Sequence, residues 1–370
     1  MRNTITIALM AILLASAPLW AEAINDDCVV VTDYGVKSDG KTDAADAIQK
    51  VIDTHPNKTI YFPDGTYLIS KPICTPADPA KSVSLRLDNY AVIKASPKWS
   101  SEEAMIRLGG KDPYKGITVN GSNYSLTGGI IDGNVERLSD RAVTGVSIDS
   151  GRETVIRNVS IKHVKMGIHL KLDPEYSPSD ADITDVNIVG TDVPGSVGVL
   201  VEGTDNTFTD MRIASVFTGV HVKSGGNCLR NIHPLFIGPS KKPIAGYEDS
   251  AAFRIEHPDN WLIYCYNDQF ATGFEFTSTR ASACTMDCCF CFWYYRPKDQ
   301  THTAIRAKEK FIGVVTNFMA NFSTDESVNV LLDEGEPGGD GVFRDLRVNE
   351  NIVKKDDAFY KHVEGKLLRW

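Results

Sequence analysis

The chain has 370 residues, of which 42% are hydrophobic and 24% are charged, a composition typical of a globular protein with enough material for a core. Its formal net charge of −9 argues against a dedicated nucleic-acid binder and against a protein that binds anionic membranes. Local basic grooves for acidic sugars are compatible with this charge.

The first 23 residues have the pattern of a secretion signal. Arg2 gives a positive start, residues 5–14 form an apolar run too short to span a bilayer, and residues 21–23 follow the small-x-small pattern of a cleavage site. We therefore expect a secreted or periplasmic protein, cleaved near Ala23. The mature chain is predicted to be one domain, made of an N-terminal cap unit (24–75), coils (76–295), and irregular C-terminal coils with a tail (296–370).

A short helix is predicted at residues 43–54, after the capping pair Thr42 and Asp43. Its apolar residues fall on one face: Ala47, Ile48, Val51 and Ile52. Such a helix can close the open end of a stack of strands, where unpaired backbone would otherwise invite aggregation. Strands are expected next in TIYFPDGTYLI (59–69) and SVSLRLDNYAVIKAS (82–96).

One short phrase then recurs along the chain, for example as TGVHVKSG from Thr218. Its copies align on a small residue at position zero: Gly145, Gly167, Gly198, Gly219, Ala252 and Gly273. Positions one and three of every copy are apolar, so the twelve side chains at these positions should point into one interior. A second strand in each period begins with Asn or Asp, at Asn158, Asp185, Asp210 and Asn231, and less clearly at Asp287.

The spacing of these copies decides the fold class. Starts are separated by about 21 residues, or by about 32 where a loop is inserted, which indicates a solenoid of strands. A period of about 21 residues is too short for a four-stranded propeller blade, but it can form one coil of a parallel β-helix. We expect an all-β, single-stranded parallel β-helix with a short N-terminal capping helix.

The segment DYGVKSDGKTDAADAIQKVID, followed by TIYFPDGTYLI (33–69), resembles the opening of the polygalacturonase-like proteins of the pectate-lyase superfamily. SLRLDNYAVIKAS and GGIIDGN (128–134) continue the resemblance, which extends to about Asn231. It implies a right-handed parallel β-helix that acts on polysaccharides.

The catalytic motifs of polygalacturonases are missing from this chain. In FTGVHVKSG, Phe217 and Thr218 stand where the family carries two adjacent aspartates. The motifs N-T-D, G-H-G and R-I-K do not occur in the sequence. No catalytic residue can therefore be carried over from the resemblance.

Positions two and four of the repeated strand should point outward and form two neighbouring columns, because adjacent coils lie about 4.8 Å apart. Position two reads Ser147, His169, Leu200, His221, Arg254 and Glu275. Position four reads Asp149, Lys171, Glu202, Lys223, Glu256 and Thr277.

Two kinds of chemistry are open to these columns. Hydrolysis needs two carboxyl groups, about 5.5 Å apart for retention or about 6.5–9.5 Å apart for inversion, for which Glu202, Glu256 and Glu275 are the candidates. A uronide lyase needs a base, for which His169 and His221 are candidates, and a cation for the sugar carboxylate. The candidate cations are Lys171, Lys223 and Arg254. The alternating charges also fit a solvated charge ladder without a function.

From the resemblance we expect an exported glycoside hydrolase acting on a polysaccharide or oligosaccharide. A uronide polysaccharide lyase and a non-catalytic carbohydrate-binding or structural β-helix are the alternatives. No nucleic-acid or membrane partner is expected, and a homotrimer of side-by-side β-helices is left open. A catalytic groove should be bounded by the inserts at residues 173–182 and 234–249.

No cofactor or metal site is predicted, although Asp180, Asp182 and Asp185 leave calcium open. The cluster of cysteines from Cys265 to Cys291 lacks the spacing of a zinc site and is interpreted as small core residues. Cys28 and Cys74 flank the N-terminal unit and could pair. His233 is interpreted as a turn residue, and the aromatics of 261–270 and 290–295 as core or interface residues.

Overall fold

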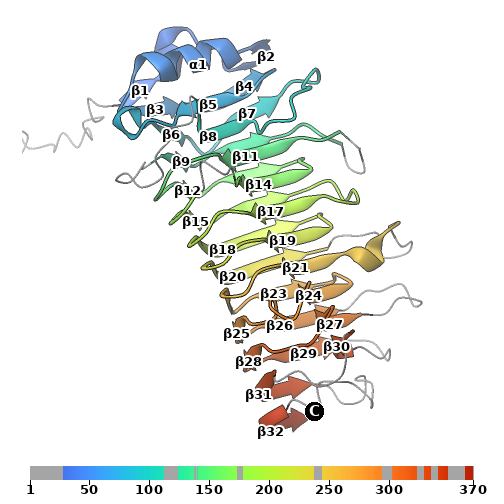
Figure 1. The fold of residues 1–370 in the computed structure, drawn as a ribbon. Coiled ribbons are helices and arrows are strands. Elements are labelled where there is room, and N and C mark those ends of the chain that lie inside the picture. The colour runs from blue at the N-terminus through green and yellow to red at the C-terminus, as the bar shows by residue number, and fades with distance from the viewer. Residues whose placement is uncertain are drawn as a thin grey trace, which may run out of the picture.

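The computed structural model describes residues 28–111, 124–136, 139, 141–172, 178–236, 244–293, 302–322, 329–334, 341–348 and 363–369. Within them the strands stack coil upon coil along one axis, from the helix α1 (Ala45–Thr54) at one end to the strand β32 (Val363–Arg369) at the other (Figure 1). The predicted secretion signal lies outside the described residues. Across the described ranges, no helix is long and apolar enough to cross a membrane.

Each regular coil contributes strands to three rows. The first row is a ten-stranded sheet of β5 (Ile73–Pro76), β8 (Ile106–Lys111), β11 (Thr144–Ile148), β14 (Met166–Leu170), β17 (Val197–Val201), β19 (Thr218–Val222), β21 (Ala251–Ile255), β24 (Thr272–Phe276), β27 (Thr303–Ala307) and β30 (Asn329–Asp333). Its described strands pair in parallel, in chain order.

The other two rows belong to one larger sheet, because four long strands continue around the corner between them. One row contains β1 (Cys28–Val30), β3 (Thr59–Phe62), β6 (Ser84–Leu87), β9 (Ser125–Thr127), β12 (Val155–Arg157), β15 (Asp182–Thr184), β18 (Thr207–Ala214), β20 (Cys228–Leu235), β22 (Trp261–Ile263), β25 (Thr285–Asp287), β28 (Val314–Thr316), β31 (Val342–Val348) and β32. The other contains β2 (Asp39–Asp43), β4 (Gly65–Ile69), β7 (Ala91–Ala95), β10 (Ile130–Asp132), β13 (Ser160–Lys162), β16 (Asn187–Val189), β23 (Tyr266–Asp268), β26 (Phe290–Trp293) and β29 (Met319–Phe322), with the second halves of β18, β20, β31 and β32. Short 3-10 turns lie at Val31–Tyr34, Pro79–Lys81 and Tyr247–Asp249.

The interior confirms the period-two pattern of the sequence. All twelve side chains at positions one and three of the repeated phrase are buried, and the rings of Phe253 and Phe274 stack with centroids 4.8 Å apart. The parallel β-helix predicted from the repeat is confirmed. The coil formed by β27, β28 and β29 pairs in register with the coil before it.

From β12 onward, the corner between the two rows of the larger sheet is marked by a left-handed residue in each described coil. Asn158, Asp185, Asp210 and Asn231, which were expected to open the second strands, have φ values of 56°, 54°, 55° and 51°. Short polar side chains tolerate this conformation better than other non-glycine residues. The corner position continues as Tyr264, Cys288, Asn317 and Asp345 in the later coils.

The helix α1 begins at Ala45, two residues later than the sequence pattern indicates. Asp43 ends the strand β2 instead, and its carboxylate accepts hydrogen bonds from Ala45 N (3.1 Å) and Ser70 N (3.2 Å). Ala45, Ile48, Val51 and Ile52 are buried against the first coils, while Ala47 is only half-buried.

All eight cysteines fall within the described residues and carry free thiols. Cys28 and Cys74 lie on strands of different sheets, so the pairing considered for them does not form. Cys265, Cys284, Cys289 and Cys291 are buried core residues, as expected, but the prediction was wrong for Cys288, which is exposed at the corner of its coil. Burial raises the pKa of the Cys284 thiol to about 11, so this thiol is inert at neutral pH.

Candidate functional site

The two outward columns of the ten-stranded sheet form as the sequence indicates. Ser147, His169, Leu200, His221, Arg254 and Glu275 are register partners from strand to strand, from β11 to β24. The predicted site residues fall into four groups of ion pairs along these columns, described below from the centre outward.

Glu202 lies between two basic side chains from neighbouring coils, His169 and Lys223. Its Oε2 is 2.8 Å from His169 Nε2, and its Oε1 accepts a hydrogen bond from Lys223 Nζ at 3.1 Å. Burial acts to raise the pKa of Glu202, but the hydrogen bonds from His169 and Lys223 outweigh burial and lower it. Glu202 is therefore an ionised anchor at neutral pH, and it orients both partners.

His221 is paired with Glu256 of the next coil, with Nε2 and Oε1 2.5 Å apart. Only 16% of the His221 side chain is exposed, and this burial lowers its pKa, while the charge of Glu256 acts in the opposite direction. A histidine with a lowered pKa is neutral at pH 7 and can accept a proton. Glu256 fixes the orientation of the ring, as the second member of acid–base pairs commonly does.

Glu275 is the most deeply buried carboxylate of the columns, with 2% of the residue exposed. Arg254 Nε donates to it at 2.6 Å, and Lys308 Nζ and Arg306 Nη1 lie 3.4 and 4.0 Å from its oxygens. Arg306 also pairs with Glu334 at 2.8 Å. Among the described side chains, three cations thus face two carboxylates here, an excess of positive charge.

The opposite end of the columns is charge-balanced. Lys171 pairs with Glu103 and lies 3.7 Å from Asp149, and Arg107 lies 2.5 Å from Asp149 and 3.4 Å from Glu103. The hydrogen bond from Lys171 lowers the pKa of Glu103. In the described part of this end, two cations face two carboxylates, which fits the charge-ladder interpretation better than a binding site.

Sequence reasoning missed five members of these networks: Glu103, Arg107, Arg306, Lys308 and Glu334. The segments MIRLG (105–109) and AIRAK (304–308) carry the same alternation, with an arginine at position two. They escaped the alignment because Met105 and Ala304 stand where most copies have glycine. A search for apolar residues at positions one and three, without requiring a glycine at position zero, would have found both segments.

The place where polygalacturonases carry adjacent aspartates is covered by aromatic side chains. Phe217 is 4% exposed and packs on Phe236 at a centroid distance of 5.4 Å. Phe236 in turn contacts Tyr247 (4.9 Å) and Phe270 (5.4 Å). Loss of the aspartates at this position therefore goes together with an apolar cover at the start of β19.

The insert at residues 234–249, which carries Phe236 and Tyr247, also positions Arg254. Its Nη2 donates to Asp249 O at 2.9 Å, while Nη1 lies 3.5 Å from Thr218 Oγ1. The predicted groove depends on residues 173–177 and 237–243, which lie outside the described part of the chain. The groove therefore stays a prediction.

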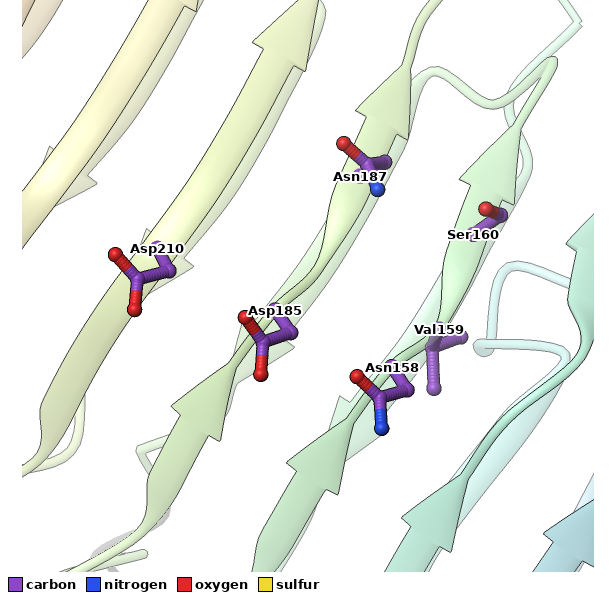
Figure 2. A pocket seen from close by; sticks show the side chains of 6 residues that line it. All are labelled: Asn158, Val159, Ser160, Asp185, Asn187 and Asp210. Carbon is purple, nitrogen blue, oxygen red and sulfur yellow. The ribbon is translucent and has the colours of Figure 1, made fainter.

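Two hollows lie on the corner between the rows of the larger sheet. The first, of about 450 Å³, is lined by Asn158, Val159, Ser160, Asp185, Asn187 and Asp210. Figure 2 shows Asn158, Asp185 and Asp210 in a row on successive strands, with Ser160 and Asn187 beside them. Its lining holds no aromatic or cationic side chain that would favour a sugar ligand.

The calcium hypothesis gains no support from these acidic residues. Asp180 accepts a hydrogen bond from Arg152 Nε at 2.8 Å, and Asp182 lies 3.5 Å from Arg157. Asp185 stands apart, at the corner. Among the described residues, no group of three metal-ligating side chains comes together.

The second hollow, of about 590 Å³, is lined by aromatic and polar side chains, including His233, Tyr264, Tyr266 and Phe290. His233 is not a turn residue, as the sequence suggested, but belongs to β20 and stacks on Tyr266 with centroids 4.0 Å apart. The aromatics of this region divide between the two surroundings: Phe270 and Trp293 are in the core, whereas Tyr264 is 62% exposed.

Comparison with known proteins places these features in context. The pattern of the family described as rhamnogalacturonase A/epimerase, pectate lyase-like matches residues 28–232. Alginate lyase 7 of Azotobacter vinelandii is 31% identical over 126 residues, a match that covers 33% of this chain and 13% of that protein.

Solved structures share the fold. A hyperthermoactive exopolygalacturonase from Thermotoga maritima superimposes with a TM-score of 0.56 at 12% identity, over 93% of this chain and 91% of that one. The A-module of the Azotobacter vinelandii mannuronan C-5 epimerase AlgE6 gives a TM-score of 0.54 at 14% identity, over 92% and 99%. The similar proteins thus include a lyase, a polygalacturonase and an epimerase.

Proposed function

Because the chain belongs to the rhamnogalacturonase A/epimerase, pectate lyase-like family, a family of carbohydrate-active β-helix proteins, we propose that it is a lyase of uronic-acid polysaccharides. The reaction is assigned to the outward columns of the ten-stranded sheet, around His221 and Arg254. The lyase name of a protein 31% identical over part of the chain is consistent with this choice.

One observation carries the proposal: a neutral base stands next to an excess of positive charge. His221 and Arg254 are register partners on adjacent strands, and Glu275 and Arg306 follow in the same column. The three cations around Glu275 can hold a sugar carboxylate. Neutralising that carboxylate makes the neighbouring C–H more acidic, which is what a base such as His221 requires.

The proposed elimination balances without an oxidant or reductant. His221 takes the proton from C5 of the uronide, and the C–H electron pair becomes the double bond between C4 and C5. The bond from C4 to the glycosidic oxygen breaks at the same time. That oxygen leaves with the bonding electrons and takes a proton from water or from the protonated ring.

Hydrolysis, the reaction expected from the resemblance, is less well supported by the side-chain geometry. A hydrolase needs one carboxyl group that stays protonated to donate to the leaving oxygen. Here Glu202, Glu256 and Glu275 are all paired with basic side chains. Glu202 and Glu256 also stand two coils apart, roughly 10 Å between equivalent backbone positions, which is at the edge of the inverting range.

The experiment is a panel of polysaccharides in which reducing ends and the ultraviolet absorbance of unsaturated uronide are followed together. The proposal predicts that both signals rise on a uronide polymer. His221→Gln should lower the rate by about 10²-fold or more, the usual contribution of a general base. His163→Gln is the matched control. His163 directly follows β13 in the larger sheet, away from the columns, and pairs with Asp132.

Other outcomes separate the alternatives. Reducing ends without absorbance would establish hydrolysis and move the assignment to the three glutamates. Binding of polymer without either signal would establish a non-catalytic carbohydrate-binding protein. Export with cleavage near Ala23 is proposed alongside, and N-terminal sequencing of the protein from the cell exterior or periplasm tests it. Light scattering on the purified protein tests the homotrimer.

A further inference from the structure

The second hollow of the larger sheet has the construction of a binding site separate from the columns. We call it the ring trough and define it by Arg212, Asn231, His233, Tyr264, Tyr266, Cys288 and Phe290. It lies on the corner between the two rows of the larger sheet, whereas the columns belong to the ten-stranded sheet. Its volume of about 590 Å³ is in the range of small-ligand sites.

One wall of the ring trough is a ladder of side chains on successive coils. Arg212 and His233 are register partners, and Tyr266 and Phe290 are register partners. The rings of His233 and Tyr266 are stacked 4.0 Å apart, and Tyr266 and Phe290 follow at 4.7 Å. This stack fixes the rings, so the wall is preorganised.

The other wall contains a residue that the fold does not explain. Tyr264 occupies the left-handed corner position at φ 54°, where the preceding coils use Asn or Asp. A bulky aromatic residue is costly in this conformation, and a hydrophobic ring that is 62% exposed gains little from packing. The next coil repeats the anomaly with an exposed Cys288 at φ 53°. Two unfavourable corners in succession, both lining the ring trough, point to a function.

The polar groups of the ring trough suit an acidic ligand. Arg212 is exposed, and no described carboxylate lies within ion-pair distance of its guanidinium. Asn231 donates its Nδ2 to Asp210, which leaves its Oδ1 without a described partner and able to accept a hydroxyl. His233 Nε2 is buried 3.6 Å from Asp268 and makes no hydrogen bond with a described group.

We propose that the ring trough binds an acidic oligosaccharide, with a sugar ring on the exposed face of Tyr264, its carboxylate at Arg212 and a hydroxyl at Asn231. The sugar class follows the proposed polysaccharide activity, but binding here does not depend on cleavage at the columns. A second site of this kind would hold a polymer on the face away from the columns.

Cys288 provides a readout at the site itself, because it is the exposed cysteine of the chain and lines the ring trough. The rate at which N-ethylmaleimide modifies Cys288 is measured by mass spectrometry in the presence of oligogalacturonate, oligomannuronate or a neutral oligosaccharide of equal length. We expect saturable protection by an acidic oligosaccharide and much weaker protection by the neutral one. The titrations are made in the His221→Gln background, so that the probe is not cleaved.

Two variants test the walls. Tyr264→Asn restores the residue type of the preceding corners, and Arg212→Gln removes the free cation. Each should raise the half-protecting concentration by about tenfold, the loss expected for one good contact. Tyr90→Asn is the matched control, because Tyr90 is 76% exposed on a distant coil. Tyr264→Asn should melt at the same temperature as the parent or higher, which separates loss of binding from loss of fold.

Three outcomes would overturn the proposal: no protection by either acidic probe, protection unchanged in Tyr264→Asn, or equal protection by the neutral oligosaccharide. Protection that disappears in Lys308→Gln but persists in Tyr264→Asn would assign the binding to the columns instead. Failure of cleavage in the polysaccharide panel, with protection intact, would refute the lyase proposal and leave the ring trough in place.

Discussion

His221 and Glu202 both have pKa values below their ordinary values of 6.5 and 4.5, so both bind protons less readily when the chain is folded. The unfolded state then binds more protons than the native state, and stability rises with pH in these windows. The contribution of His221 is present above pH 6.5 and is lost as the pH falls through its lower folded value. The contribution of Glu202 is lost in the same way below pH 4.5.

We therefore predict that the free energy of unfolding falls as the pH drops below 6.5, and that this fall is smaller in His221→Gln. Urea denaturation at several pH values measures it. The kcat/KM for elimination should fall over the same pH range as His221 becomes protonated. Parallel slopes in the His221→Gln variant and the wild type would contradict the prediction.

A second residue-scale feature is a buried ladder of asparagines, Asn206, Asn227 and Asn260, at one turn of three successive coils. Asn206 Nδ2 donates to Asn227 Oδ1 at 3.1 Å, and Asn227 Nδ2 donates to Asn260 Oδ1 at 3.2 Å. The same Oδ1 atoms accept the backbone N–H groups of Asn206 and Asn227. Each amide therefore satisfies the backbone of its neighbour.

Asn227→Ala should destabilise the protein by about 2–4 kcal/mol, because it leaves buried donors and acceptors on both neighbouring coils without partners. Chemical denaturation measures the loss. Asn187→Ala, at an exposed position of β16, is the control and should change stability by about 0.5 kcal/mol or less. A loss of similar size in both variants would show that the ladder is not a main source of stability.

At the scale of the strand, the small residue at position zero is explained by close contact between coils. A Cβ added at Gly198 would lie 2.5 Å from Gly219 O and 2.4 Å from Ile213 Cγ2. Gly167 has the same relation to Gly198 O, also at 2.5 Å. The strands of the ten-stranded sheet begin where the backbone of the next coil leaves no room for a side chain.

Gly198→Ala should therefore cost about 1–3 kcal/mol, the usual range for overpacking. Thermal and urea unfolding measure this cost. Gly195→Ala is a comparison with a different cause, since its added Cβ meets no atom within 4 Å and only its φ of +77° opposes the change. Unchanged stability in Gly198→Ala would mean that the coils can move apart at this point.

The strands and their faces could be predicted because period-two alternation decides which side chains are interior, and a repeat fixes the register between coils. The ion pairs could not, since alternation places Glu202 and His169 on one surface without choosing their rotamers. Tyr264 was grouped with the core or interface aromatics for a related reason. Corners were identified by Asn or Asp, and the corner position of this coil has neither. The asparagine ladder ends the phrases VEGTDN, KSGGN and EHPDN, so its signal was present in the sequence and was not used.

At the scale of the whole molecule, a solenoid has two ends at which backbone groups and apolar side chains lack a next coil. Each coil contacts its neighbours alone, so an unprotected end weakens the stack and offers strand edges to other molecules. At the N-terminal end this exposure is limited by α1, which lies across the first coils (Figure 1). Ile48 and Ile52, on the inner face of α1, are fully buried.

Ile48→Asp should detach this cap, because an unpaired carboxylate cannot be buried without a cost of several kcal/mol. We expect the N-terminal coils to open first, so that trypsin cuts them early while the later coils stay protected, and the exposed edges to drive concentration-dependent association in light scattering. Lys50→Ala, on the exposed side of the same helix, should behave as the wild type. If Ile48→Asp instead unfolds all coils together without association, the solenoid is one cooperative unit, and α1 acts as part of its core rather than as a cap.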